Sequence, residues 1–147
     1  MPSPMEWALE QAGRAQARGE VPVGAVLIDA AGNVLASAGN EVEARHDPTA
    51  HAEMLVLRAA GALRRTTRLE ACDLYVTLEP CAMCAAAIAF ARIRRLYYGA
   101  YDPKGGAVEH GPRFFAQPTC HHRPEAYGGI EERRAAALLK DFFQERR

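Results

Sequence analysis

The chain has 147 residues, of which 49% are hydrophobic and 24% are charged, and its formal net charge is zero. This composition excludes a disordered chain and favours one domain over residues 1–147. The balanced charge excludes a bulk electrostatic attraction to nucleic acid, so any polyanion must be bound by a local patch. The chain opens with no secretory signal, and its most apolar run (82–91) is too short to span a bilayer. We expect a cytoplasmic protein without a membrane anchor.

The first half of the chain predicts a helix, a hairpin and a second helix. Residues 4–18 carry apolar side chains at helical spacing. Residues 21–28 and 34–40 read as two strands joined by a turn at 30–33. Pro48 disfavours helix at the residue before it, and Thr49 is the expected N-cap of a helix over 50–65.

The second half continues this alternation of strands and helices. Strands are expected over 72–78 and 94–100, with a helix over 81–91 between them, and Pro80 suits the first turn of that helix. Residues 107–123 read as a loop. A last helix is expected over 131–145, with these residues facing inward: Ala135, Leu138, Leu139, Phe142 and Phe143. Strands alternating with helices predict a three-layer α/β/α sandwich.

Two cysteines at a helix start are the first sign of a metal site. Cys81 and Cys84 are spaced so that both sulfurs share one face of the first turn, where the helix dipole favours the thiolate form. Catalytic zinc needs three protein ligands and one open position for water, and His51 is the candidate third ligand. Two thiolates and an imidazole favour zinc over other divalent metals. We predict one zinc ion per chain.

Glu53 follows His51 by two residues, a spacing that normally points side chains to opposite sides of a helix. The side chains of His51 and Glu53 can reach the same small target only if it lies beyond the N-terminal end of the helix. There Glu53 can take a proton from water and pass it to a leaving amine. A lone His-x-Glu is a weak signal, because a histidine at a helix start is more often a polar cap. Together with a downstream Pro-Cys-x-x-Cys, it is the signature of zinc nucleobase deaminases.

Longer stretches then carry a resemblance that covers nearly the whole chain. They are "EVPVGAVLI" (20–28), "RHDPTAHAEM" (45–54), "LYVTLEPCAMC" (74–84) and "ARIRRLYYGAYDPKGGA" (91–107). The chain resembles the cytidine deaminase-like superfamily, and within it the branch that deaminates adenosine to inosine at the wobble position of tRNA. The resemblance implies a mixed five-stranded sheet flanked by helices, a homodimer, and the anticodon loop of a tRNA as partner.

The resemblance also implies roles for individual residues. His51, Cys81 and Cys84 match the zinc ligands, and Glu53 matches the proton-shuttling carboxylate. The residues that it implies for substrate contact are Asn40, Asp102, Lys104 and Phe143.

Residues 107–130 depart from the pattern of that branch, in a region where substrate choice is expected to be set. A deaminase of a free nucleobase or nucleoside, such as guanine or cytosine, therefore remains an alternative. A third hypothesis is a non-catalytic, zinc-stabilised RNA-binding subunit, which would have no need of Glu53. Assays on a tRNA and on free bases, side by side, distinguish these hypotheses.

Overall fold

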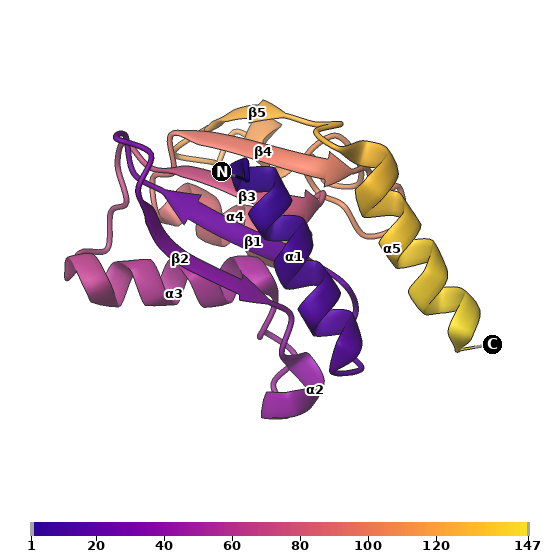
Figure 1. Ribbon diagram of the computed structural model, residues 1–147. Helices are drawn as coiled ribbons and strands as arrows, with labels where there is room; N and C mark the ends of the chain where they lie inside the picture. Colours follow the sequence, from indigo (N-terminus) through magenta and orange to yellow (C-terminus); the bar gives the residue numbers. More distant parts are fainter. Residues whose placement is uncertain (1, 147) are drawn as a thin grey trace.

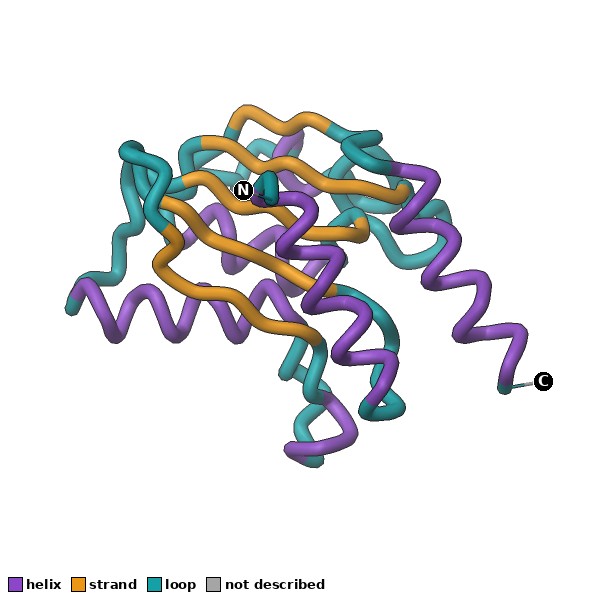
Figure 2. Tube along the Cα trace, viewed as in Figure 1, coloured by secondary structure: helices purple, strands orange, loops and turns teal. Residues whose placement is uncertain are grey.

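The protein, described here over residues 2–146 by a computed structural model, is built on one mixed sheet of five strands (Figure 2). The strands are β1 (Gly24–Ile28), β2 (Val34–Gly39), β3 (Asp73–Leu78), β4 (Arg95–Ala100) and β5 (Glu125–Tyr127). Their order in the sheet is β2-β1-β3-β4-β5. β1 runs antiparallel to β2 and β3, whereas β3, β4 and β5 are parallel. The predicted mixed five-stranded sheet is confirmed.

Helices cover both faces of this sheet, which gives the predicted three layers (Figure 1). α1 (Pro4–Ala17) and α5 (Glu132–Glu145) lie on one face, and α3 (Ala52–Arg64) and α4 (Ala82–Phe90) on the other. A short α2 (Val42–Arg45) follows β2, and a 3₁₀ turn covers Phe114–Ala116. Within residues 2–146, no helix has the length and hydrophobicity needed to cross a membrane.

Helix α1 lies unusually close to the sheet because two strand residues have no side chain. A Cβ atom on Gly24 would lie only 2.0 Å from the carbonyl oxygen of Ala8, and one on Gly39 only 2.6 Å from that of Gln11. The helix begins with a reciprocal capping box between Ser3 and Glu6. Its position therefore depends on glycine in β1 and β2.

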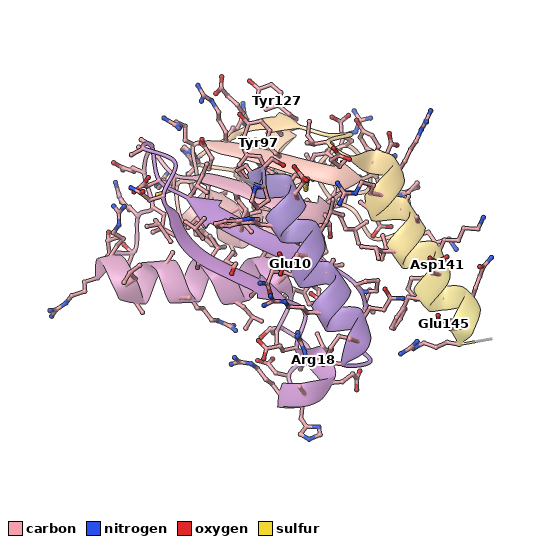
Figure 3. The ribbon with its side chains drawn as sticks, in the orientation of Figure 1. Glu10, Arg18, Tyr97, Tyr127, Asp141 and Glu145 are labelled. Atoms are coloured by element: carbon pink, nitrogen blue, oxygen red, sulfur yellow. The ribbon has the colours of Figure 1, made fainter. Side chains whose placement is uncertain are left out.

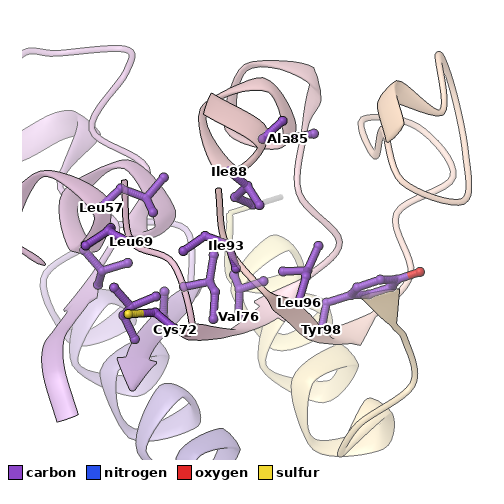
Figure 4. Close-up of a cluster of buried hydrophobic side chains, with 14 of the residues drawn as sticks. Leu57, Leu69, Cys72, Val76, Ala85, Ile88, Ile93, Leu96 and Tyr98 are labelled. Atoms are coloured by element: carbon purple, nitrogen blue, oxygen red, sulfur yellow. The ribbon is translucent and has the colours of Figure 1, made fainter. Parts of the chain in front are cut away.

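The larger of two apolar clusters fills the space between the sheet and helices α3 and α4 (Figure 4). Leu74, Val76 and Leu96 project into it from the sheet, and Ile88 enters from α4, all fully buried. Burying a leucine or isoleucine side chain contributes about 1.5–3 kcal/mol. This cluster therefore anchors the two helices whose first turns carry the candidate metal ligands.

Three details differ from the sequence-based expectation. Thr49 is not a helix cap, since its N–H and hydroxyl both donate to Asp47 Oδ1 at 2.8 and 2.7 Å, and α3 begins later, with His51 as its N-cap. The short elements α2 and β5 were not expected, because three or four residues show no clear periodicity. Phe143, predicted to face inward, is 54% exposed.

Aromatic rings connect the three parallel strands. Tyr97 stacks between Tyr75 and Tyr127, with ring centroids 4.5 and 5.3 Å apart. Tyr97 and Tyr127 lie at the β4–β5 edge of the sheet (Figure 3). Offset-stacked pairs add about 0.5–1.5 kcal/mol each beyond the area they bury. The stack therefore helps to hold β5, which has only three residues.

Candidate active site and metal centre

The candidate metal ligands come from the first residues of two helices that pack side by side. His51 is the N-cap of α3 and Cys81 the N-cap of α4, and Cys84 lies one turn into α4. Nδ1 of His51 lies 3.7 Å from Sγ of Cys81 and 3.6 Å from Sγ of Cys84. The three ligand atoms all lie within 4.8 Å of one another. The fold thus brings together residues that are 30 positions apart in the chain.

These distances fit a tetrahedral zinc ion. With Zn–S near 2.3 Å and Zn–N near 2.05 Å, two ligands at the tetrahedral angle are about 3.6 Å apart. The measured separations of 3.6 and 3.7 Å match this value. Three protein ligands of type N, S and S leave one tetrahedral position open, as catalytic zinc sites do. His51, Cys81 and Cys84 therefore form a candidate site for one zinc ion.

The two thiols also show the charge pattern of a metal site. A hydrogen bond from the Cys84 thiol, together with the nearby His51 ring, lowers the pKa of Cys81 to about 4. The same hydrogen bond and burial raise the pKa of Cys84 far above its usual range. Without a cation between them, two sulfurs this close share one proton, because two adjacent negative charges repel. A divalent cation removes this conflict and allows both to bind as thiolates.

Glu53 lies in the first turn of α3, beside the three ligands, and is only 4% exposed. Burial raises its pKa to about 7, a value that suits a group which both takes and gives a proton near neutral pH. Its Oε1 atom is buried and has no hydrogen-bond partner among residues 2–146. A buried carboxylate oxygen without a partner is costly to keep, and such groups concentrate at functional sites.

The metal centre opens into a cavity of about 540 Å³ that is lined by His51, Glu53 and Cys81. Two of the residues predicted to contact substrate, Asn40 and Asp102, also line it. Oδ1 of Asn40 accepts a hydrogen bond from the N–H of Ala52 at 2.8 Å, which fixes the amide at the start of α3. The cavity is large enough for a nucleobase, since ligand pockets generally span about 300–1,000 Å³.

The other two predicted contact residues lie outside this cavity. Lys104 is exposed on the loop after β4, and Phe143 is exposed on α5. Phe142, its neighbour, lines the cavity and is 4% exposed, with the guanidinium of Arg146 3.6 Å above its ring. The structure thus brings six of the eight predicted site residues together, and leaves Lys104 and Phe143 at its periphery.

Two buried carboxylates at the cavity have no role in the sequence-based prediction. Glu20 accepts hydrogen bonds from the N–H groups of Glu43 and Ala44, and so holds α2 against the cavity. Glu79 accepts hydrogen bonds from several groups of the loop after β4. The signal for Glu79 is its position directly before the Pro-Cys-x-x-Cys motif. For Glu20, an acidic residue before an apolar strand is too common to be diagnostic.

Comparisons with known proteins agree with this chemistry. Residues 3–100 match the family described as the cytidine and deoxycytidylate deaminase zinc-binding region. A tRNA-specific adenosine deaminase of Agrobacterium fabrum is 59% identical over 143 residues, which cover 97% of this chain and 93% of that protein. A tRNA-specific adenosine deaminase of Aquifex aeolicus is 44% identical, over 95% of this chain and 91% of the relative.

Two solved structures extend the comparison. A structure from a study of A-to-I editing by tRNA:A34 deaminases at the wobble position superposes with a TM-score of 0.91, at 59% identity, and covers 92% of this chain and 98% of that one. A guanine deaminase from Nitrosomonas europaea superposes with a TM-score of 0.74 at 26% identity, and covers 95% of this chain and 82% of that one.

Proposed function

The chain belongs to the cytidine and deoxycytidylate deaminase family, and from this premise we propose that it hydrolyses adenosine to inosine at the wobble position of a tRNA. The whole of residues 1–147 would act as one zinc-dependent deaminase domain. The relatives named for the tRNA reaction share 44% and 59% of their aligned residues with this chain.

The observation that carries the proposal is the arrangement around the cavity. Ligand atoms of His51, Cys81 and Cys84 converge within 4.8 Å, and the partnerless carboxylate oxygen of Glu53 lies beside them. Zinc bound by the three ligands would supply a water whose pKa falls from about 15.7 to about 7. Burial raises the pKa of Glu53 to about 7, which suits a group that takes and gives a proton beside that water.

In the proposed reaction Glu53 carries the proton. Its carboxylate takes a proton from the attacking water and gives it to ring N1 as oxygen bonds to C6 of the adenine, and it then passes the proton of the new hydroxyl group to the exocyclic amine. The C6–N bond breaks, ammonia leaves and inosine remains. Glu53 lines the cavity and is only 4% exposed, so its carboxylate is placed to pass protons within the cavity.

The residues proposed to contact substrate divide into an inner and an outer set. Asn40 and Asp102 line the cavity and would bind the flipped nucleoside. Since Oδ1 of Asn40 is engaged by Ala52, its amide N–H groups remain to donate to the substrate. Lys104 and Phe143, both exposed, would contact the RNA outside the cavity, through phosphate attraction and base stacking.

A direct assay tests the proposal. The zinc-loaded protein is incubated with a tRNA that carries a wobble adenosine, and inosine is measured in digested RNA. A matched tRNA with guanosine at that position is the control substrate. Free adenine, guanine and cytosine and their nucleosides are assayed in parallel for ammonia release. Inosine at the wobble position is the expected result, and its absence with zinc-replete protein would contradict the tRNA proposal.

The two alternative functions are less well supported. The free-base reaction has a guanine deaminase as structural neighbour, but at 26% identity against 59% for the structure from the wobble-editing study. A non-catalytic RNA-binding subunit would leave the buried, partnerless Glu53 without a use. Both alternatives are decided by the same assay, since one gives free-base turnover and the other gives none.

We further propose that the protein is a cytoplasmic homodimer. Helix α4 is almost wholly apolar, and its Phe90 is 73% exposed, which favours a partner surface on this helix. The substrate tRNA and four cysteines that form no disulfide favour a reducing compartment. Light scattering of the protein and of Phe90→Ser tests the dimer, which the substitution is expected to weaken.

A further inference from the structure

The carboxylate of Glu79 receives hydrogen bonds from both ends of one loop. Glu79 follows β3, two residues before the metal ligand Cys81, and its side chain is fully buried. Oε1 accepts from the N–H of Asp102 at 3.0 Å and from Nδ1 of His110 at 2.8 Å. Oε2 accepts from the N–H groups of Val108, Glu109 and His110 at 3.1, 2.9 and 3.1 Å. Five donors thus converge on one carboxyl group.

These donors enclose residues 101–110, which we call the β4 loop. Asp102 lies near its start and His110 at its end, so Glu79 ties the two together. The loop packs against the carboxylate without a gap, since a Cβ atom on Gly106 would lie 2.5 Å from the Glu79 carboxyl carbon. The N–H of Ala107 also donates to the carbonyl of Pro80 at 2.8 Å, which joins the loop to the residue before Cys81.

The β4 loop forms one wall of the cavity. Asp102 and Gly105 line it, as do the metal ligands His51 and Cys81. Oδ1 of Asp102 accepts from the N–H groups of Lys104 and Gly105, so this wall is ordered by its own hydrogen bonds. The Glu79 carboxylate supplies most of the hydrogen bonds that fix the wall relative to the metal centre, and the Ala107–Pro80 hydrogen bond adds one more.

We propose that Glu79 is a positioning residue, which holds the cavity wall formed by the β4 loop at a set distance from the metal ligands and so governs substrate binding. His110 supports it through its ring. This inference rests on the proposed function for the identity of the substrate, because a wall carrying Asp102 would contact the nucleoside or its neighbours. Glu79 would touch no reacting atom, so its loss should weaken binding more than it slows chemistry.

The test compares Glu79→Gln, His110→Ala and the control Glu70→Gln. Glutamine keeps the size of the side chain, but its NH₂ group faces N–H donors, so either the three donors at Oε2 or the two at Oε1 lose their acceptor. Glu70 precedes β3 at the opposite end of the strand, is exposed, and offers the same carboxylate-to-amide change. Each protein is assayed for bound zinc, for kcat and KM on a wobble-adenosine stem-loop RNA, and for amide hydrogen exchange.

For Glu79→Gln we expect wild-type zinc content, a rise in KM of about tenfold or more, and a kcat within about threefold. The amides on the side that loses its acceptor, either that of Asp102 or those of residues 108–110, should exchange at least about tenfold faster. His110→Ala should raise KM by a smaller factor in the same direction, and Glu70→Gln should change neither constant. His110→Ala carries the test if Glu79→Gln does not fold.

Loss of zinc, a fall in kcat at unchanged KM, or wild-type protection of the Asp102 amide together with the 108–110 amides would each overturn the proposal. If the unmodified protein shows no turnover of RNA, the proposed function fails instead. In that case the exchange rates and the zinc content alone decide whether Glu79 holds the loop, so the two failures are distinguishable.

Discussion

Replacing Glu53 by glutamine should stop turnover while zinc stays bound. The carboxylate is 4% exposed, and its Oε1 atom has no hydrogen-bond partner within residues 2–146, so little of the fold depends on its charge. Proton transfer by a positioned side chain contributes about 10²–10⁴-fold, and kcat should fall by that factor. Inosine formation and zinc content are measured on the same preparation, with Glu10→Gln on the exposed face of α1 as the control.

The same substitution should stabilise the protein once zinc has been removed by a chelator. Burial raises the pKa of Glu53 from 4.5 to about 7 in the folded protein. As the pH rises, the carboxyl group of Glu53 therefore loses its proton at a lower pH in the unfolded chain than in the folded one. Between these two pH values the wild type loses stability, and above them the loss levels off at on the order of 3 kcal/mol. Glu53→Gln has no proton to lose.

Urea unfolding of the metal-free proteins therefore tests the stability cost of the buried Glu53 charge, independently of activity. At a pH of about 8 the variant should unfold at higher urea concentration than the wild type, and below a pH of about 4 the two should coincide. An active variant would refute the proton-transfer role. A variant that is less stable at the higher pH would refute the argument that the buried charge is costly.

Three further changes test the metal site, the packing of α1 and the ionisation of Glu79. Cys84→Ser should lower bound zinc to below about one tenth per chain and abolish activity, as measured by elemental analysis, because the site loses a thiolate ligand. Gly24→Ala should lower the melting temperature by several degrees in calorimetry, since the new Cβ would collide with the carbonyl of Ala8, and overpacking costs about 1–3 kcal/mol. Burial alone would raise the pKa of Glu79, but hydrogen bonds from the β4 loop hold this pKa below its usual value of 4.5. The ionised carboxylate therefore stabilises the fold above a pH of 4.5, and this stabilisation is lost as the pH falls further. Glu79→Gln should consequently flatten the acid side of the stability profile, measured by urea unfolding between pH of about 6 and about 3.

The metal centre was predictable because its ligands lie at helix starts, where spacing in sequence translates directly into spacing in space. Cys81 and Cys84 share a helical turn, so their pairing follows from local geometry alone. His51 could be added only through the combined motif, because nothing local shows that two helix N-termini will meet. The two helices pack against each other on the same face of the sheet (Figure 1), and this packing brings their N-termini together.

What escaped prediction depends on contacts between distant segments. The role of Glu79 becomes visible only when the loop 23–31 residues further along the chain folds back onto it. His51 and not Thr49 is the N-cap of α3, because the N–H and hydroxyl of Thr49 both donate hydrogen bonds to the side chain of Asp47. Phe142 and Phe143 are adjacent and chemically alike, and only the packing of α5 determines which of them lines the cavity.

The three-residue strand β5 has a consequence for solubility. It pairs with β4, whose backbone would otherwise present unsatisfied amide and carbonyl groups at the margin of the sheet. Such margins recruit strands from neighbouring molecules and begin aggregation. Since three residues alone hold a strand weakly, the stacked rings of Tyr75, Tyr97 and Tyr127 help to keep β5 paired with β4, which leaves only this short strand at the edge. Replacing Tyr127 would remove one of the two stacking contacts, and the protein would then aggregate faster in concentrated solution without a change in catalysis.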